Sequence, residues 1–112
     1  MKPISDDIKN LIRKIFNTQH PLLAEIIINW SKIVGLKFSR NSSPMKINSS
    51  KEKGLLVNIL YVEVENASLS MEMSFQQEII IERIAVYLGF KAIHKIRLII
   101  HKYDTKNLTL IS

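Results

Sequence analysis

Apolar residues recur along this chain at two different periods, and the change between them separates a helical first third from a strand-rich remainder. Residues 5–16 place apolar side chains at the three-and-four spacing of one helix face, with Ser5 as the N-cap. The same spacing predicts a second helix over residues 21–34, which starts at a proline and ends at Gly35. We expect Trp30 in this helix to be a core anchor rather than a ligand-stacking residue.

Extended and alternating segments follow the second predicted helix. We expect an extended piece at residues 36–40 and a polar loop at residues 41–44. Residues 45–48 can form a short strand, and the polar connection at residues 49–54 ends in glycine, as hairpin loops usually do. The strongest predicted strand covers residues 55–64, which are rich in valine, isoleucine and leucine.

The two faces of the strand over residues 55–64 differ in composition. One alternating set of side chains includes Asn58, whereas the other set is fully apolar. We expect the core to be lined by the fully apolar set: Leu55, Val57, Ile59 and Tyr61. Residues 65–75 also alternate between apolar and polar, which favours a strand, although their methionine and glutamate content would also allow a short helix.

A third helix and a last strand complete the predicted order. Ser74 and Gln77 have capping-box spacing, and Gly89 ends this helix. Residues 92–103 alternate as a strand does, with one mostly apolar face and one face that carries positive charge. Residues 104–112 form a short tail that can add an edge strand.

The 112 residues fit a single domain over residues 1–112, with an N-terminal helical segment at residues 1–17. The two strands of the middle hairpin must pair antiparallel. The order of elements therefore predicts a two-layer α+β domain, in which amphipathic helices pack on one face of a small antiparallel sheet.

Composition narrows the class of partner. The formal net charge is +6, which indicates a polyanion such as nucleic acid, or else simply a lysine-rich surface. There is no cysteine, which fits a reducing cytosol, so we expect a cytoplasmic protein. No signal peptide is recognisable, and no apolar run approaches the roughly 20 residues of a membrane span, so we expect no membrane partner.

No catalytic or metal-binding motif is present in the sequence. His94 and His101 are seven positions apart on a predicted strand and so fall on opposite faces, while His20 lies in a turn before proline. Paired glutamates are better explained as solvated faces than as metal ligands. We therefore expect no catalytic residue, no metal, no cofactor and no small-molecule substrate, and hence no enzymatic activity.

Basic residues are the remaining chemical signal. If the hairpin and the last strand adjoin, their basic residues form one positive surface able to contact phosphates. Aromatic residues among them are few, so we expect base stacking to be limited. The candidate nucleic-acid-binding residues are Lys37, Arg40, Lys46, Lys51, Lys53, Lys91, Lys95, Arg97 and Lys102.

A succession of short motifs adds a family resemblance. The motif Trp-Ser-Lys-Ile-Val-Gly begins at Trp30, Pro44 follows, and a glycine then precedes the strong strand. Glu-Arg-Ile in the third helix and Leu-Gly-Phe-Lys-Ala-Ile before the last strand complete the series. This order over roughly residues 10–102 resembles the DciA family, the ancestral bacterial loaders of the replicative helicase and formerly a domain of unknown function. The residues that carry the pattern as structural positions are Trp30, Gly35, Pro44, Gly54 and Gly89.

The resemblance implies a KH-like fold, DNA binding with single strands as the expected form, and interaction with the hexameric replicative helicase. It implies no enzymatic activity. Two alternatives stay open on the residues alone. The first is a protein–protein adaptor that does not bind nucleic acid. The second is an RNA-binding KH-like module, which is disfavoured because the chain lacks the Gly-x-x-Gly clamp of such domains.

Overall fold

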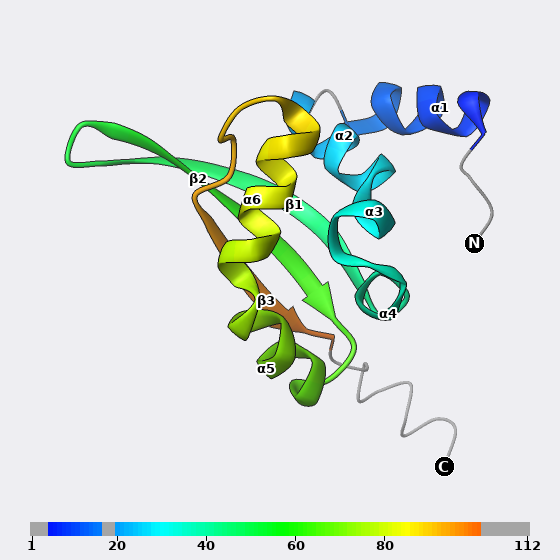
Figure 1. Cartoon of the computed structure of the whole chain (residues 1–112). Coiled ribbons are helices and arrows are strands. Elements are labelled where there is room, and N and C mark those ends of the chain that lie inside the picture. Colours follow the sequence, from blue (N-terminus) through cyan, green and yellow to red (C-terminus); the bar gives the residue numbers. More distant parts are fainter. Residues whose placement is uncertain (1–4, 17–19, 102–112) are drawn as a thin grey trace, which may run out of the picture.

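The computed structural model describes residues 5–16 and 20–101, in which six helices accompany three strands (Figure 1). In chain order the elements are α1 (Asp6–Phe16), α2 (Pro21–Ile28), α3 (Trp30–Val34), α4 (Leu36–Ser39), β1 (Ser42–Glu52), β2 (Leu55–Val64), α5 (Ala67–Phe75), α6 (Gln77–Leu88) and β3 (Lys95–Ile100). Helices α2, α3, α5 and α6 lie on one face of the sheet (Figure 1). The predicted α+β class is therefore confirmed, while the KH-like assignment stays a prediction.

The sheet has the order β1-β2-β3 and is mixed rather than antiparallel. Strands β1 and β2 form the predicted antiparallel hairpin, but β2 and β3 run parallel, from the pair Ile59 and Lys95 to the pair Val64 and Ile100. The expectation of a purely antiparallel sheet is wrong for this second pair. The physical reason is the crossover through α5 and α6, which returns the chain to the same end of the sheet.

The hairpin is longer than the sequence suggested. Strand β1 continues to Glu52, so the predicted loop at residues 49–54 is wrong in all but its last two positions. The turn consists of Lys53 and Gly54, whose φ angles of 52° and 79° are those of the two-residue turns that suit twisted hairpins. The polar residues before the turn resemble a loop because their side chains are exposed on a strand that extends beyond the helices (Figure 1).

Two local predictions around α3 are also wrong. The helix expected over residues 21–34 is interrupted at Asn29, whose side-chain amide donates to the carbonyl of Glu25 at 2.9 Å. Asparagine competes in this way for backbone groups and so favours helix ends. The segment expected to be extended at residues 36–40 forms the short helix α4, which follows the predicted stop at Gly35.

Residues 67–75 form helix α5, so the strand favoured for residues 65–75 is wrong. The side-chain oxygen of Asn66 accepts a hydrogen bond from the amide of Leu69 at 2.8 Å, which caps the helix. The capping box predicted at Ser74 is also wrong, because Ser74 lies inside α5 and its hydroxyl donates to the carbonyl of Met71 at 2.8 Å. Helix α6 ends as predicted at Gly89, which has the left-handed conformation.

The core is lined by the face of β2 that the sequence analysis assigned to solvent. Leu60, Val62 and Val64 are buried, and Asn58 beside them is only 8% exposed, so the expected core set of Leu55, Val57, Ile59 and Tyr61 is on the wrong side. Asn58 fits there because it is fully hydrogen-bonded. Its contacts are Asn58 Nδ2 to Ala92 O (2.8 Å), Ser49 Oγ to Asn58 Oδ1 (2.6 Å) and Asn58 N to His94 Nδ1 (3.0 Å).

Helix α1 begins at its predicted cap and projects beyond α2 (Figure 1). Arg13 Nε donates to Glu25 Oε1 at 2.7 Å and joins the two helices, and this hydrogen bond raises the pKa of the Arg13 guanidinium. Ile8 and Leu11 on its apolar stripe are 52% and 55% exposed.

Among the helices that the structure describes, none is long and apolar enough to cross a bilayer. The predicted tail at residues 104–112, residues 102–103 of the predicted last strand, and residues 1–4 and 17 of the N-terminal segment lie outside the described residues.

Candidate nucleic-acid interface

Within residues 5–16 and 20–101, no helix packs on one face of the sheet, and this uncovered face defines the candidate interface. On β2 it consists of the side chains that alternate with the buried set: Val57, Ile59, Tyr61 and Glu63. Directly paired residues of neighbouring strands share a face of the sheet. The register therefore adds Lys46 and Asn48 from β1 and Lys95 and Arg97 from β3.

Three of the predicted basic residues meet on the uncovered face. Tyr61 pairs with Lys46 on one side and with Arg97 on the other. Lys46, Tyr61 and Arg97 therefore form one row across the sheet, which we call the Tyr61 row. The ammonium group of Lys46 lies 4.8 Å from the centre of the Tyr61 ring, which is cation–π distance. Lys95 lies in the next row, beside Ile59, and its Nζ is 3.3 Å from Glu52 Oε1. The hairpin and the last strand thus adjoin, which is the condition on which a single positive surface depends.

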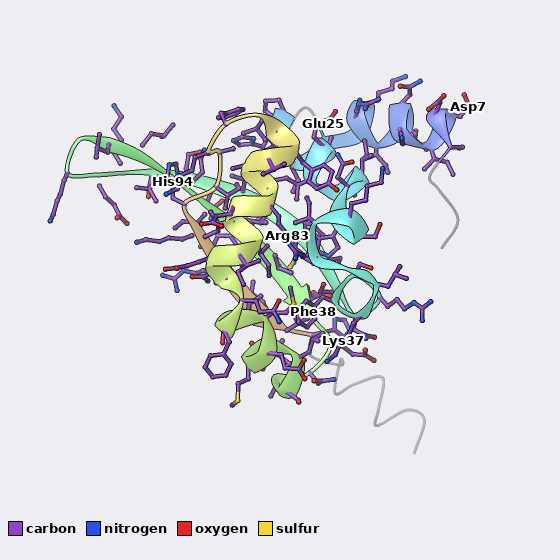
Figure 2. All side chains as sticks on the ribbon, viewed as in Figure 1. Asp7, Glu25, Lys37, Phe38, Arg83 and His94 are labelled. Atoms are coloured by element: carbon purple, nitrogen blue, oxygen red, sulfur yellow. The ribbon has the colours of Figure 1, made fainter. Side chains whose placement is uncertain are left out.

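The end of the hairpin carries two more of the predicted residues. Lys51 and Lys53 are exposed there, together with the large apolar side chains of Leu55 and Leu56. Side chains spread from both sides of this projecting segment, which lies clear of the helices (Figure 2). The hairpin end therefore carries positive charge beyond the helices, with Lys53 in the turn and Lys51 opposite Leu56, on the side of the sheet away from Tyr61.

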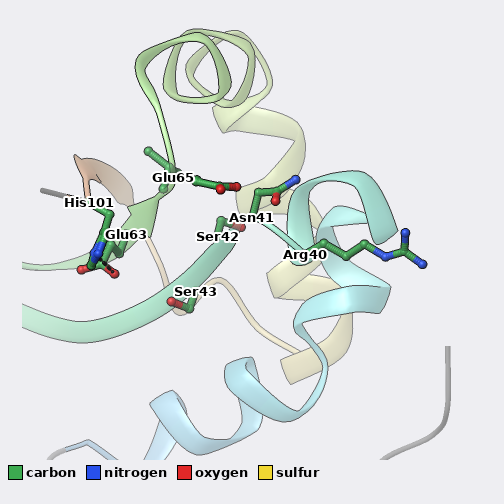
Figure 3. Close-up of a pocket in the computed structure, with 8 residues that line it drawn as sticks. Arg40, Asn41, Ser42, Ser43, Glu63, Glu65 and His101 are labelled. Atoms are coloured by element: carbon green, nitrogen blue, oxygen red, sulfur yellow. Dashed lines mark hydrogen bonds and ion pairs between the residues drawn. The ribbon is translucent and has the colours of Figure 1, made fainter. Parts of the chain in front are cut away.

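Lys37 and Arg40 are placed apart from the uncovered face. Both belong to the α4 region, and Lys37 Nζ lies 2.8 Å from Glu72 Oε2 on α5. Figure 3 shows Arg40 at a hollow that is lined by Arg40, Asn41, Ser42, Ser43, Glu63, Val64, Glu65 and His101. Within it Glu63 Oε1 lies 3.0 Å from His101 Nδ1, and the Arg40 side chain extends away from that pair (Figure 3). Two carboxylates make this hollow a poor phosphate site.

Lys91 also lies away from the row formed by Lys46, Tyr61 and Arg97. It lines a hollow together with Glu78 and Glu82 of α6 and with His94, so this hollow carries two acidic residues as well as the lysine. Figure 2 shows His94 close to the start of β3. Lys102, the last of the predicted residues, lies outside the described part of the chain.

The residues that carry the family pattern support the fold. Trp30 is buried, as expected of a core anchor, and its Nε1 donates to Ser42 Oγ at 3.1 Å. Gly35 and Gly54 have φ angles of 87° and 79°, and a Cβ at either would meet nothing within 4 Å. Glycine is needed at these two positions for backbone conformation and not for space. Pro44 lies on edge strand β1 next to the irregularity in its pairing with β2.

The ring nitrogens of His20 and His94 accept backbone hydrogen bonds, one local and one from a residue distant in sequence. His20 Nδ1 accepts from the amide of Leu22 at 3.2 Å, and His94 Nδ1 accepts from the amide of Asn58. Over residues 5–16 and 20–101, the structure brings together no group of three or more side chains able to ligate a metal ion.

Tyr61 is the residue whose place at the candidate interface the sequence analysis missed. It was assigned to the core with the fully apolar set. A signal against that assignment was present, because the same alternation continues to Glu63 and would bury its carboxylate. The opposite set continues through Val62 and Val64 and can be buried without that cost.

Comparison with known proteins identifies the family. The family model described as Dna[CI] antecedent, DciA, matches residues 3–98, which include the hairpin, the α5–α6 crossover and most of β3. An uncharacterized protein of Rickettsia prowazekii (strain Madrid E) is 44% identical over 106 residues, or 95% of this chain and 98% of the relative. The resemblance drawn from the sequence motifs is confirmed, and the chain belongs to the DciA family.

Proposed function

We propose that this protein is a non-enzymatic accessory of DNA replication that acts in the cytoplasm, binds DNA and helps the replicative helicase onto single strands. Family membership is the observation that carries the proposal, because the DciA family is associated with loading of that helicase and the match spans residues 3–98. The protein supplies contacts and no covalent chemistry in this role.

The uncovered sheet face supports the DNA-binding part of the proposal. Lys46 projects from β1, Lys95 and Arg97 project from β3 on the other side of β2, and Lys53 adds positive charge at the hairpin turn. Lysine and arginine on such a surface bind the phosphate backbone without reading sequence. Glu52 partly offsets Lys95, so the strongest contacts are expected from Lys46 and Arg97.

Helix α1 favours a second candidate, a protein–protein adaptor that does not need nucleic acid. Ile8 and Leu11 expose apolar area on a helix that projects beyond the sheet and the remaining helices. An exposed apolar stripe of this kind suits a groove on another protein. If the protein is such an adaptor, co-purification should recover the helicase equally well after nucleic acid has been removed.

Co-purification with the replicative helicase of the same organism tests the proposed function. The tagged protein is expected to retain the helicase, and single-stranded DNA is expected to increase the amount retained. Failure to retain the helicase with or without DNA contradicts the loader role. Retention that is unchanged by nuclease treatment and by added DNA favours the adaptor.

A salt titration tests DNA binding separately. Fluorescence anisotropy with a labelled single strand should give sequence-independent binding that weakens with salt, with a log–log slope of about −2 if three phosphates are neutralised. Reversing charge with Lys46→Glu and Arg97→Glu should weaken binding at low salt by about tenfold or more. Lys14→Glu on α1 is the matched control and should have little effect. Absence of binding at low salt, or binding that salt does not change, contradicts the electrostatic mechanism.

A further inference from the structure

We propose that Tyr61 is a base-stacking residue, so that the uncovered sheet face selects single-stranded DNA with accessible bases. This inference rests on the proposed DNA binding and adds to it a residue and a form of DNA. Tyr61 is the one aromatic residue in strands β1, β2 and β3. It lies on the central strand, on the face where no helix packs among the residues that the structure describes.

The row through Tyr61 has the composition of a single-strand binding surface. Lys46 and Arg97 stand on either side of the ring, and both are exposed. Single-strand binding sites are built from two parts. Cationic side chains bind the phosphate backbone, and an aromatic ring stacks on a base. Apolar Ile59 lies on the same face two residues away, where a second base can rest.

The contact between Lys46 and Tyr61 marks the ring face on which a base can stack. The ammonium group lies 4.8 Å from the ring centre, over the ring face that a base would occupy. Lys46 is exposed and lies on an edge strand, so its side chain can swing from the ring to a neighbouring phosphate when a base stacks there. The exchange gives the lysine a phosphate in place of the ring, and the stacked base then covers the ring.

Charge also limits the length of the site. Glu63 follows Tyr61 on the same face and is joined to His101 at 3.0 Å, so the positive surface ends at that side. Towards the hairpin end, Lys95 continues it and Lys53 adds positive charge at the turn, whereas Lys51 pairs with Leu56 on the opposite side of the sheet. The DNA strand is therefore expected to run from the Tyr61 row toward the hairpin rather than toward Glu63.

Duplex DNA cannot use the ring in this way. Its bases are stacked within the helix, and extruding one costs free energy that a single ring contact does not return. A duplex can still contact Lys46, Lys95 and Arg97 through its phosphates. Removing the ring should then weaken single-strand binding and leave duplex binding unchanged.

The test compares three fluorescein-labelled probes of equal length: oligo(dT), an abasic strand with the same phosphates, and a blunt duplex. At fixed low salt, Tyr61→Leu is expected to weaken oligo(dT) binding by about tenfold and to leave the other two probes within about twofold. Tyr61→Phe retains the ring and is expected to bind oligo(dT) as the unchanged protein does. An equal loss on all three probes, or no loss on oligo(dT), overturns the proposal.

The unchanged protein provides a second measurement that does not depend on a variant folding. It is expected to bind oligo(dT) about tenfold more tightly than the abasic strand at the same salt concentration. Equal, salt-sensitive affinity for the two strands overturns the stacking role while leaving the proposed electrostatic binding intact. If no probe binds at low salt, both proposals fail.

Discussion

The two faces of β2 follow different physical rules although they belong to the same ten residues. On the covered face, Leu60, Val62 and Val64 are packed by helices, and the polar Asn58 is tolerated because each of its groups has a partner. On the uncovered face, Tyr61 is half-buried between two cations. Burial therefore dominates on one face, whereas the other face presents charged side chains around a half-buried ring.

The largest expected effect comes from the covered face. Leu60→Ala removes a fully buried side chain and should lower the free energy of unfolding by about 2–5 kcal/mol, because a cavity adds to the lost apolar burial. Ile59→Ala, one residue away on the uncovered face, is the matched control and should cost about 1 kcal/mol. Urea unfolding followed by circular dichroism measures both. Equal losses would contradict the assignment of the two faces.

A smaller effect is expected from the polar group of the covered face. Asn58→Ala leaves the Ala92 carbonyl and the Ser49 hydroxyl without their present partner and should cost about 1–3 kcal/mol. Asn48→Ala is the matched control at an exposed position of β1 and should stay within about 0.5 kcal/mol of the unchanged protein. Chemical unfolding measures the difference. A negligible cost for Asn58→Ala would mean that this hydrogen-bond cluster contributes no stability.

The smallest effect on stability is expected at the edge of the uncovered face, where the same substitution should raise the affinity for DNA. Glu52→Gln removes the carboxylate from Lys95 and should change stability by less than about 1 kcal/mol, since the pair is exposed. DNA affinity should rise about two- to threefold, because one negative charge is lost and Lys95 becomes available to a phosphate. Glu72→Gln makes the same charge change beside Lys37 and is the control for anisotropy measurements. An equal gain from both variants would indicate a response to net charge alone.

Local signals in the sequence predicted the ends of several elements correctly. Ser5 caps α1, and Gly35 and Gly89 end α3 and α6, because each of these residues acts through its own backbone or a neighbouring amide. The amphipathic helices and the hairpin were predictable for the same reason. The basic residues were recognisable as a group, but only the register brings Lys46 and Arg97 to the same row.

The errors arose where the decisive partner is distant in sequence. Asn58 appears unsuited to a core until Ala92 and His94 satisfy it from more than thirty residues away. The alternation in residues 65–75 was outweighed by the Asn66 cap and by packing against the sheet. The parallel direction of β3 depends on how α5 and α6 cross the sheet, and no local pattern encodes that path.

The parallel pairing of β2 with β3 has a consequence for synthesis of the protein on the ribosome. The hairpin joins neighbours in the chain and can close within microseconds once Val64 has emerged. Ile100 is made roughly two to seven seconds after Val64 at ordinary translation rates, and the other edge of β2 stays unpaired over an interval of that order. During that interval the nascent chain presents an open strand to its neighbours, so we expect chaperone binding and aggregation to be decided before the last strand is added.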